Sequence, residues 1–190
     1  DYSLVDLLSF SAHKFEGPKG VGFLAYRSNL NFLPLISGGS QEFGVRGGTV
    51  NLPGIVSSTI ALENILLVKS KRANIQSYYD KIKAFVLENP AELVLNSPES
   101  GSPYVINFSF THLKASVILE ALSEKGIYVS SVSACSSKAE PVSEVLLALG
   151  KSRTLAKNSL RVSFSIRTKE NEVNAFLTEL GKIMKEVRPR

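Results

Sequence analysis

The feature that most constrains the fold is a helical hydrophobic period in the middle of the chain. Apolar residues recur at spacings of mostly three and four from Ile55 to Val86, which is typical of one face of an α-helix. Pro53 is compatible with a first helical turn, and Pro90 would end the helix. A helix of about 35 residues is about 50 Å long, which is longer than one small domain needs. We therefore expect it to connect two parts of the protein.

The segment before this helix predicts two strands and a long loop. Leu4–Ser11 and Gly20–Arg27 are short, apolar and rich in β-formers, and the intervening Gly17-Pro18 favours a tight loop. Residues 37–51 contain five glycines and too few apolar side chains for a core element. Long ordered loops in compact domains are often functional, so this loop is a candidate binding element.

The segment after the helix alternates between strand and helix patterns. We expect strands at Tyr104–Phe110, Ile127–Ser130 and Leu160–Ile166, and helices at Lys114–Glu124, Pro141–Leu149 and Lys169–Val187. Gly126 and Gly150 would end the first two of these helices. The pattern predicts a small α/β sandwich whose helices cover one side of a mixed or antiparallel sheet.

The whole chain is therefore predicted to have an α/β fold in three parts. These are two strands and a loop at 1–52, the bridging helix at 53–90, and a small C-terminal α/β domain at 91–190. The chain begins at Asp1 without a Met, in a strand-like segment. We expect it to be a piece of a longer protein.

Composition and charge exclude several other classes of protein. Hydrophobic residues make up 44% of the chain and charged residues 21%, as in ordinary globular proteins. The single cysteine can form neither an internal disulfide nor a Cys-rich zinc site. No apolar run is long enough for a membrane helix, and no signal peptide begins the chain, so we expect a cytoplasmic location. Residues 151–190 carry ten basic against four acidic residues, whose dispersal favours a solvated helix face over a nucleic-acid surface.

The first candidate site follows the first predicted strand, at Ser11-Ala12-His13-Lys14. Alternate strand residues share a face, so Ser11 and His13 could contact one group together, and a hydroxyl with an imidazole suits a phosphate. A lysine held beside a cofactor can form a Schiff base. A polar strand end in solvent is the alternative explanation.

The glycine-rich loop is the second candidate site. Its backbone N–H groups and the Thr49 hydroxyl lie close to the predicted helix start, an arrangement that favours anions. The spacing of a P-loop and of a dinucleotide fingerprint is absent. A flexible linker explains the same composition.

Two further candidates lie in the C-terminal part. Cys135 is in SSVSACSSKAE, a small polar segment typical of an exposed loop, where Lys138 could favour the thiolate. The alternative is an incidental surface cysteine. Arg161, within a predicted strand, could bind a carboxylate bidentately or be a sheet-edge charge. His112 has no partner at metal-ligand spacing, so no metal site is expected.

Four segments together resemble the C-terminal half of the cysteine desulfurases, which are pyridoxal-phosphate enzymes of the class V aminotransferase family with a fold-type I architecture. In the family's order they are SFSAHKFEGPKGVGFLAYR, GGSQEFGVRGGTVNLPGIV, SSVSACSSKAEPVSEVLLALG and SLRVSFSIRTKENEV. They cover nearly the whole chain. The resemblance implies the end of a large cofactor domain followed by a complete small domain.

The resemblance also implies how the cofactor is held. Lys14 would bind pyridoxal 5'-phosphate covalently, and Ser11 and His13 would bind its phosphate. Thr49 would reach a phosphate as well, in this family commonly that of the other subunit of a homodimer. The protein would orient the reacting groups, while the cofactor would withdraw electrons.

For the substrate, the resemblance implies that Arg161 binds the carboxylate of L-cysteine and that Cys135 attacks its sulfur. A persulfide would form on Cys135 and L-alanine would be released. The full-length protein would pass this sulfur to an acceptor or scaffold protein for iron–sulfur clusters or tRNA thiolation, with no membrane partner and no direct nucleic-acid partner. The alternatives are a selenocysteine lyase or another class V enzyme, and a non-enzymatic persulfide carrier or assembly module.

The sequence departs from the family pattern at two positions. Val132 stands where a glycine is usual, which would stiffen the backbone before the cysteine, and Gly48 stands where a serine is usual. The family's stacking histidine, the aspartate that pairs with the pyridine nitrogen and the glutamine near the ring oxygen all lie upstream of this segment. The isolated chain is therefore expected to be inactive.

Overall fold

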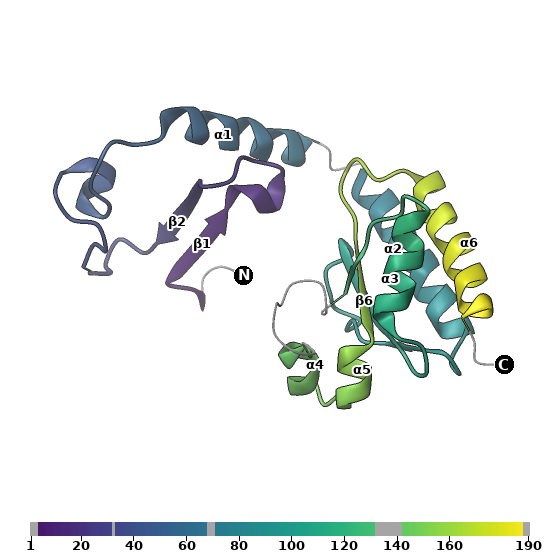
Figure 1. The fold of residues 1–190 in the computed structure, drawn as a ribbon. Helices are drawn as coiled ribbons and strands as arrows, with labels where there is room; N and C mark the ends of the chain where they lie inside the picture. The colour runs from purple at the N-terminus through teal and green to yellow at the C-terminus, as the bar shows by residue number, and fades with distance from the viewer. Residues whose placement is uncertain (1–3, 32, 68–70, 132–141, 188–190) are drawn as a thin grey trace. The chain divides into compact units, whose positions relative to one another are not determined.

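The structure is a computed structural model that describes residues 4–31, 33–67, 71–131 and 142–187 (Figure 1). The chain divides into two compact units, Asp1–Lys69 and Ser70–Arg190, which are called unit 1 and unit 2 below. Each unit contains both helices and strands. The fold is therefore the mixed α/β class predicted from the sequence.

Unit 1 is built on an antiparallel hairpin of β1 (Leu7–Ser11) and β2 (Gly22–Tyr26). Both strands lie within the predicted strand segments and are shorter than them. Ser11 lies opposite Gly22 at the end where the connection begins. That connection contains a 3-10 turn, η2 (Ala12–Phe15), where we expected only a tight loop.

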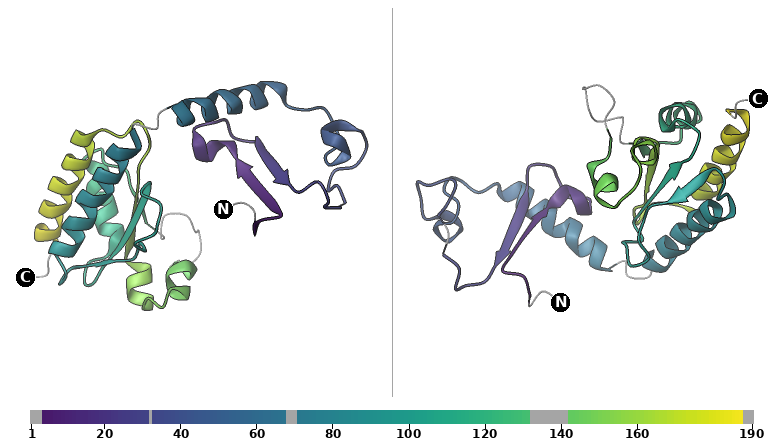
Figure 2. Two further views of the ribbon diagram at one scale, coloured as in Figure 1. Left: turned by 180° about the vertical axis from the view of Figure 1, so that it is seen from behind. Right: turned by 90° about the horizontal axis from the view of Figure 1, so that it is seen from below.

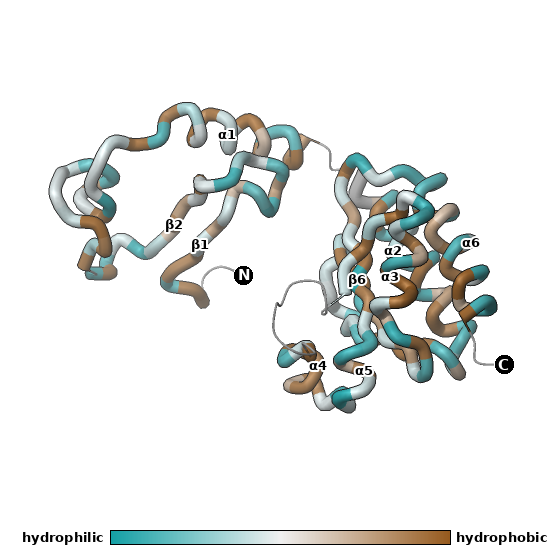
Figure 3. The backbone as a smooth tube through the Cα atoms, viewed as in Figure 1, coloured by the Kyte–Doolittle hydropathy of each residue, from teal (hydrophilic) through white to brown (hydrophobic). Residues whose placement is uncertain are grey.

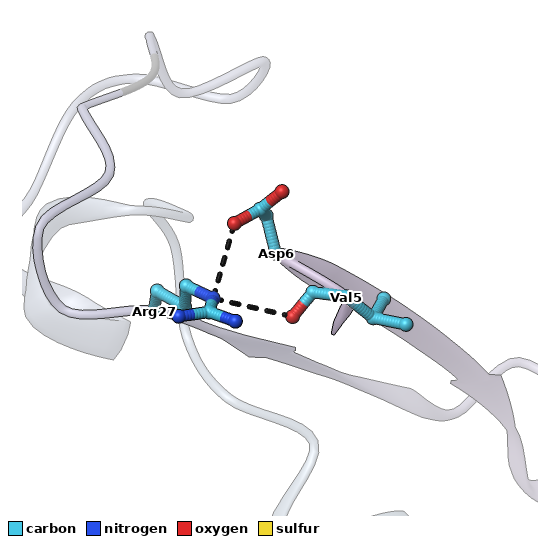
Figure 4. A network of polar contacts seen from close by, with 3 residues as sticks. All are labelled: Val5, Asp6 and Arg27. Carbon is cyan, nitrogen blue, oxygen red and sulfur yellow. Dashed lines mark hydrogen bonds and ion pairs between the residues drawn. The ribbon is translucent and has the colours of Figure 1, made fainter. Parts of the chain in front are cut away.

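Polar contacts close the other end of this hairpin (Figure 4). The Arg27 backbone N–H donates to the Asp6 carbonyl at 3.1 Å. The Arg27 Nε donates to the Val5 carbonyl at 3.4 Å and pairs with Asp6 Oδ1 at 3.0 Å. Because both side chains of the ion pair are largely exposed, we expect it to fix strand register more than to add stability.

The turn η2 is held by close backbone packing. The Ala12 N–H donates to the Val21 carbonyl at 3.0 Å, and the Gly17 N–H donates to the Ala12 carbonyl at 2.9 Å. A Cβ at Gly17 would lie 2.8 Å from the Ala12 Cβ, so this position accepts only glycine without rearrangement. Glu16 adopts a left-handed conformation with φ 66°, which closes the turn.

Helix α1 (Leu52–Leu67) packs on the η2 turn through a glycine. Gly54 is buried, and a Cβ there would lie 2.4 Å from Val21 Cγ2. The Asn51 Oδ1 accepts the Gly54 N–H at 3.2 Å, which satisfies one of the free donors in the first turn. The close approach of α1 to the hairpin connection therefore depends on the absence of a side chain at Gly54.

Most apolar side chains of unit 1 are exposed. Phe10 and Phe23 stack with ring centroids 4.8 Å apart, yet each is about two-fifths exposed. The tube coloured by hydropathy shows hydrophobic stretches along β1, β2 and α1 (Figure 3). Ala12 is the only hydrophobic side chain classed as buried among the described residues of this unit.

Unit 2 contains a four-stranded sheet with the order β3-β4-β6-β5. Its strands are β3 (Leu93–Leu95), β4 (Val105–Phe110), β5 (Ser130–Ser131) and β6 (Ser159–Ser163). Every neighbouring pair is antiparallel, so β4 and β5 run parallel with β6 between them. This is a split βαβ arrangement.

Three helices cover one face of this sheet (Figures 1 and 2). They are α2 (Lys71–Glu88), α3 (Ala115–Glu124) and α6 (Glu170–Glu186). Alternate residues of β4 and β6 are fully or almost fully buried against them, and the buried cluster draws on all three helices. Its largest fully buried members are Ile75, Ile82, Ile106, Phe108, Phe110, Ile118, Leu122, Leu160 and Leu180. The sequence pattern predicts helices on one side of a mixed or antiparallel sheet, and the structure shows the antiparallel form.

The long bridging helix expected over 53–90 corresponds to two helices, α1 and α2, which belong to different units. Residues 68–70 between them lie outside the described part of the chain. The reason for the difference is packing. The apolar residues of α2 join the core of unit 2, whereas α1 packs on η2 in unit 1. One hydrophobic period over both segments does not reveal that they face different partners.

Two short helices, α4 (Glu144–Ala148) and α5 (Arg153–Lys157), precede β6. The serines before them cap them: Ser143 Oγ accepts the Leu146 N–H, and Ser152 Oγ accepts the Leu155 N–H. Helix α4 lies inside the predicted helix 141–149, whereas α5 and β3 are additional elements that the sequence pattern did not indicate. No described helix is long and apolar enough to cross a membrane.

Candidate active site

The first group of candidate residues lies together at the end of β1. Ser11 is the last residue of the strand, and His13 and Lys14 lie in the last turn of η2. All three side chains are exposed, while Ala12 between them is fully buried. The buried Ala12 anchors the turn, so the hydroxyl, the imidazole and the amine are presented on its outer side. Sequence reasoning placed these residues on a strand end, and the structure moves His13 and Lys14 onto the turn.

The glycine-rich loop of unit 1 is folded on itself. The Gly47 N–H donates to the Ile36 carbonyl at 2.8 Å, and the Gly48 N–H donates to Gln41 Oε1 at 3.2 Å. A Cβ at Gly47 would lie within 3.1 to 3.3 Å of the backbone of residues 37–39. These contacts favour a loop with a defined, folded conformation over a flexible linker.

The same loop contains backbone strain at two residues that precede Thr49. Glu42 and Phe43, in the short 3-10 segment η3 (Gln41–Gly44), have φ angles of 50° and 58°, which are unusual for side-chain-bearing residues. Phe43 is also 96% exposed. The Arg46 Nη1 donates to the Thr49 carbonyl at 3.4 Å, and the Thr49 side chain is exposed. Strain of this kind clusters at ligand-binding segments.

In unit 2 the candidate Arg161 lies on the sheet face opposite the helices. Its neighbours in β6, Leu160 and Val162, are buried under the helices, so alternation places Arg161 on the other face. Across the strands it lies opposite Asn107 on β4 and Ser130 on β5. Among the described residues, none forms a hydrogen bond or ion pair with the Arg161 side chain. The guanidinium is therefore available to an anionic ligand.

A polar network that sequence reasoning missed lies beside Arg161. Asn96 Nδ2 donates to Asn107 Oδ1 and to Ser109 Oγ, both at 2.7 Å. Ser109 Oγ in turn donates to the Leu155 carbonyl at 2.8 Å. The signal was present in the sequence, because Asn107 and Ser109 alternate with the apolar residues of a predicted strand and so share its second face.

The remaining candidate, Cys135, lies outside the described residues, so its loop stays a prediction. The described candidates divide between the units: Ser11, His13, Lys14 and Thr49 are in unit 1, and Arg161 is in unit 2. No cluster of His, Cys, Asp or Glu with the composition of a metal site occurs among the described residues.

The family of this chain is identified by comparison with known proteins. Residues 3–176 match the family model described as Aminotransferase class-V, and the chain belongs to this family. Among its curated relatives, the cysteine desulfurase IscS of Dictyoglomus turgidum is 39% identical over 186 residues, and the cysteine desulfurase NifS of Azotobacter vinelandii is 34% identical over 188 residues. These alignments cover 97% and 98% of this chain and 47% of each relative.

Solved structures show the same relationship. A structure described as a NifS-like protein superimposes with a TM-score of 0.83 at 33% identity, covering 97% of this chain and 47% of the other. The NifS-like protein from Rickettsia africae gives 0.77 at 25% identity, covering 95% and 48%. The chain thus spans about half the length of the curated relatives and solved structures that it matches.

Proposed function

We propose that this chain is the C-terminal half of a pyridoxal-phosphate-dependent cysteine desulfurase. The observation that carries the proposal is the match to cysteine desulfurases over 97% of the chain, with Lys14 presented on a turn that buried Ala12 and the close contact at Gly17 hold in place. The proposed reaction converts L-cysteine to L-alanine and leaves a persulfide on Cys135.

The residues of unit 1 fit the cofactor that the family implies. Lys14 offers an exposed primary amine for covalent attachment, and Ser11 and His13 lie within three residues of it. The Ser11 hydroxyl makes no capping bond to η2, so it remains available to a phosphate oxygen. Thr49 adds a second exposed hydroxyl from the glycine-rich loop. When bound, pyridoxal phosphate supplies an electron-withdrawing ring that weakens bonds at the substrate's α-carbon.

Arg161 is proposed to bind the substrate carboxylate. A guanidinium offers two parallel N–H donors that match a carboxylate, and no described residue competes for the Arg161 side chain. Its position in the middle of β6 restricts the backbone on both sides. A carboxylate held there would keep the amino acid in one orientation, which lowers the entropic barrier to reaction.

Cys135 is proposed to take the sulfur. Its thiolate attacks the sulfur of the substrate cysteine, and a new S–S bond forms as the bond between that sulfur and the substrate Cβ breaks. The sulfur is oxidised and the carbon is reduced, and the proton lost from the Cys135 thiol is balanced by the one that the carbon gains. The products are a Cys135 persulfide and L-alanine. The persulfide would then pass to an acceptor or scaffold protein, and the full-length protein would act as a homodimer in the cytoplasm.

The test uses the longer polypeptide that contains this chain, purified with pyridoxal phosphate. Lys14→Ala is expected to abolish alanine release from L-cysteine and the visible absorption of the bound cofactor. Lys19→Ala, an exposed lysine five residues away in the same connection, is the matched control and should leave both unchanged. Full activity of Lys14→Ala would overturn the proposal. The isolated 190-residue chain is expected to release no alanine.

A further inference from the structure

The second face of the unit 2 sheet carries a row of polar side chains centred on Arg161. The register places Asn107 of β4 and Ser130 of β5 directly opposite it on either side. Directly opposed side chains have Cβ atoms about 4.5–5.5 Å apart, so an anion on Arg161 lies within reach of both. Asn107 is half-buried and Arg161 is exposed.

Hydrogen bonds fix which atom of the Asn107 amide faces which way. The single hydroxyl proton of Ser109 is used by the Leu155 carbonyl, so the atom of Asn96 beside Ser109 Oγ must be the donor Nδ2. The same Nδ2 contacts Asn107 at 2.7 Å, so the Asn107 atom there must be the acceptor Oδ1. The carbonyl at 155 therefore dictates the amide orientation at position 107 through two intermediate side chains.

This orientation leaves the donor end of Asn107 unused. Asn96 follows β3, which pairs with β4 on the side away from β6, so the Asn107 oxygen is turned toward the β3 side. The NH₂ group has no hydrogen-bond partner among the described residues. A second polar atom of this network, Asn96 Oδ1, is buried and has no hydrogen-bond partner within the described part of the chain. Buried polar atoms in folded proteins usually have a hydrogen-bond partner, so the Asn96 oxygen marks this network as incomplete within the described residues.

We propose that the Asn107 NH₂ group is a second donor to the carboxylate that Arg161 binds. Asn107 would touch the substrate, whereas Asn96 and Ser109 would be positioning residues that hold its amide. The inference rests on the proposed role of Arg161, and it names the substrate class of this subsite as an α-amino acid with a free carboxylate. An arginine and an amide together define the plane of a carboxylate better than the arginine alone.

The test is a titration of the isotopically labelled 190-residue chain, followed by NMR at the Arg161 Nε–H and at the Asn107 side-chain NH₂. L-Alanine is the probe, and L-alaninamide, which has the same amine and methyl group but no carboxylate, is the control ligand. Both signals are expected to shift with L-alanine and to give one binding curve. Neither should shift with L-alaninamide.

Three variants test whether the Asn107 NH₂ group contributes to L-alanine binding. Asn107→Asp keeps the acceptor for Asn96 but removes the donor, and Asn107→Leu removes the donor without adding charge. Each should weaken L-alanine binding at Arg161 by about tenfold or more, as for loss of a charge-assisted hydrogen bond. Asn174→Asp, on the exposed side of α6, makes the same change of charge away from this face and should leave binding within twofold.

The outcomes separate this inference from the function on which it rests. If Arg161 shifts with L-alanine and Asn107 does not, or if both Asn107 variants bind as tightly as the parent, the second-donor role is wrong and the proposed function stands. If Arg161 itself shows no carboxylate-dependent shift, the role proposed for Arg161 and this inference both fail.

Discussion

Unit 1 and unit 2 differ in how much of their apolar surface is buried. In unit 2, three helices and a sheet enclose a core in which Phe108 is 0% exposed. In unit 1, Leu35 and Phe43 are 99% and 96% exposed, and the stacked pair Phe10–Phe23 is only partly covered. Large exposed apolar surface indicates an interaction site. Unit 2 therefore has a buried core of its own, whereas unit 1, which contains the candidate lysine, leaves apolar surface available for contact with further protein.

The largest difference between the units is expected when one aromatic ring is removed from each. Phe108→Ala empties the centre of the unit 2 core, and the loss is expected to be about 3–5 kcal/mol in the free energy of unfolding. Phe43→Ala removes the same atoms from an almost fully exposed position of unit 1, and the expected change is below about 0.5 kcal/mol. Urea unfolding of the chain followed by circular dichroism measures both. Equal losses would contradict the contrast between the units.

The next expected effect concerns the tight contact between α1 and the hairpin connection in unit 1. Gly54→Ala places a Cβ 2.4 Å from Val21 Cγ2, so either the Val21 side chain or α1 must move, at an expected cost of about 1–3 kcal/mol. Hydrogen exchange should rise in β1, β2 and α1 and stay unchanged in unit 2.

Gly181→Ala in α6 is the matched control for that substitution. A Cβ there would meet the Phe85 ring at an ordinary contact distance of 3.9 Å, and alanine favours the helix by about 0.5–1 kcal/mol. The same change is therefore expected to stabilise unit 2 slightly. Destabilisation by Gly181→Ala, or an unchanged exchange rate after Gly54→Ala, would contradict the expected contrast between the open position 181 and the tight contact at position 54.

The smallest expected effect is electrostatic and belongs to unit 2. Glu170 at the start of α6 pairs with Lys81 of α2, and the hydrogen bond and charge of Lys81 lower the pKa of the Glu170 carboxyl below its ordinary value. A lowered carboxyl pKa adds stability above the unfolded value, and that stability is lost as the pH falls through the folded value.

We therefore expect Glu170→Gln to lower the melting temperature slightly at pH 7 and to have a decreasing effect below about pH 4.5. Glu186→Gln near the other end of α6 serves as the control, because Glu186 forms no ion pair with another described residue. Thermal melts across this pH range make the comparison. A difference in melting temperature between Glu170→Gln and the parent that grows toward low pH would contradict this expectation.

The sequence allowed prediction of the elements whose signals are local. The helices at 114–124 and 169–187 have complete apolar stripes, and Gly126 adopts the positive φ of 73° that its role as a helix end requires. In contrast, β3 has three residues and α5 has five, which is too short for a period to be recognised. The partners of α1 and α2 depend on packing over long sequence distances, which a hydrophobic pattern does not encode.

The residues of the candidate site also divide into those with a local sequence signal and those whose contacts depend on the fold. Ser11, His13 and Lys14 were found because they are contiguous, and Thr49 and Arg161 because of their sequence surroundings. Asn96 was missed because its bonds to Asn107 and Ser109 join residues more than ten positions apart and depend on strand register. The family match strengthens the roles proposed for these residues, and the roles themselves stay predictions.

We propose above that Lys14 and Cys135 serve one desulfurase reaction. The most direct measurement is the mass of the Cys135-containing peptide after the longer protein, with pyridoxal phosphate, has reacted with L-cysteine. We predict the added mass of one sulfur atom on Cys135 in the parent and in Lys19→Ala, and none in Lys14→Ala. Release of L-alanine at the parental rate by Cys135→Ser, or an unmodified Cys135 during turnover, would contradict the account.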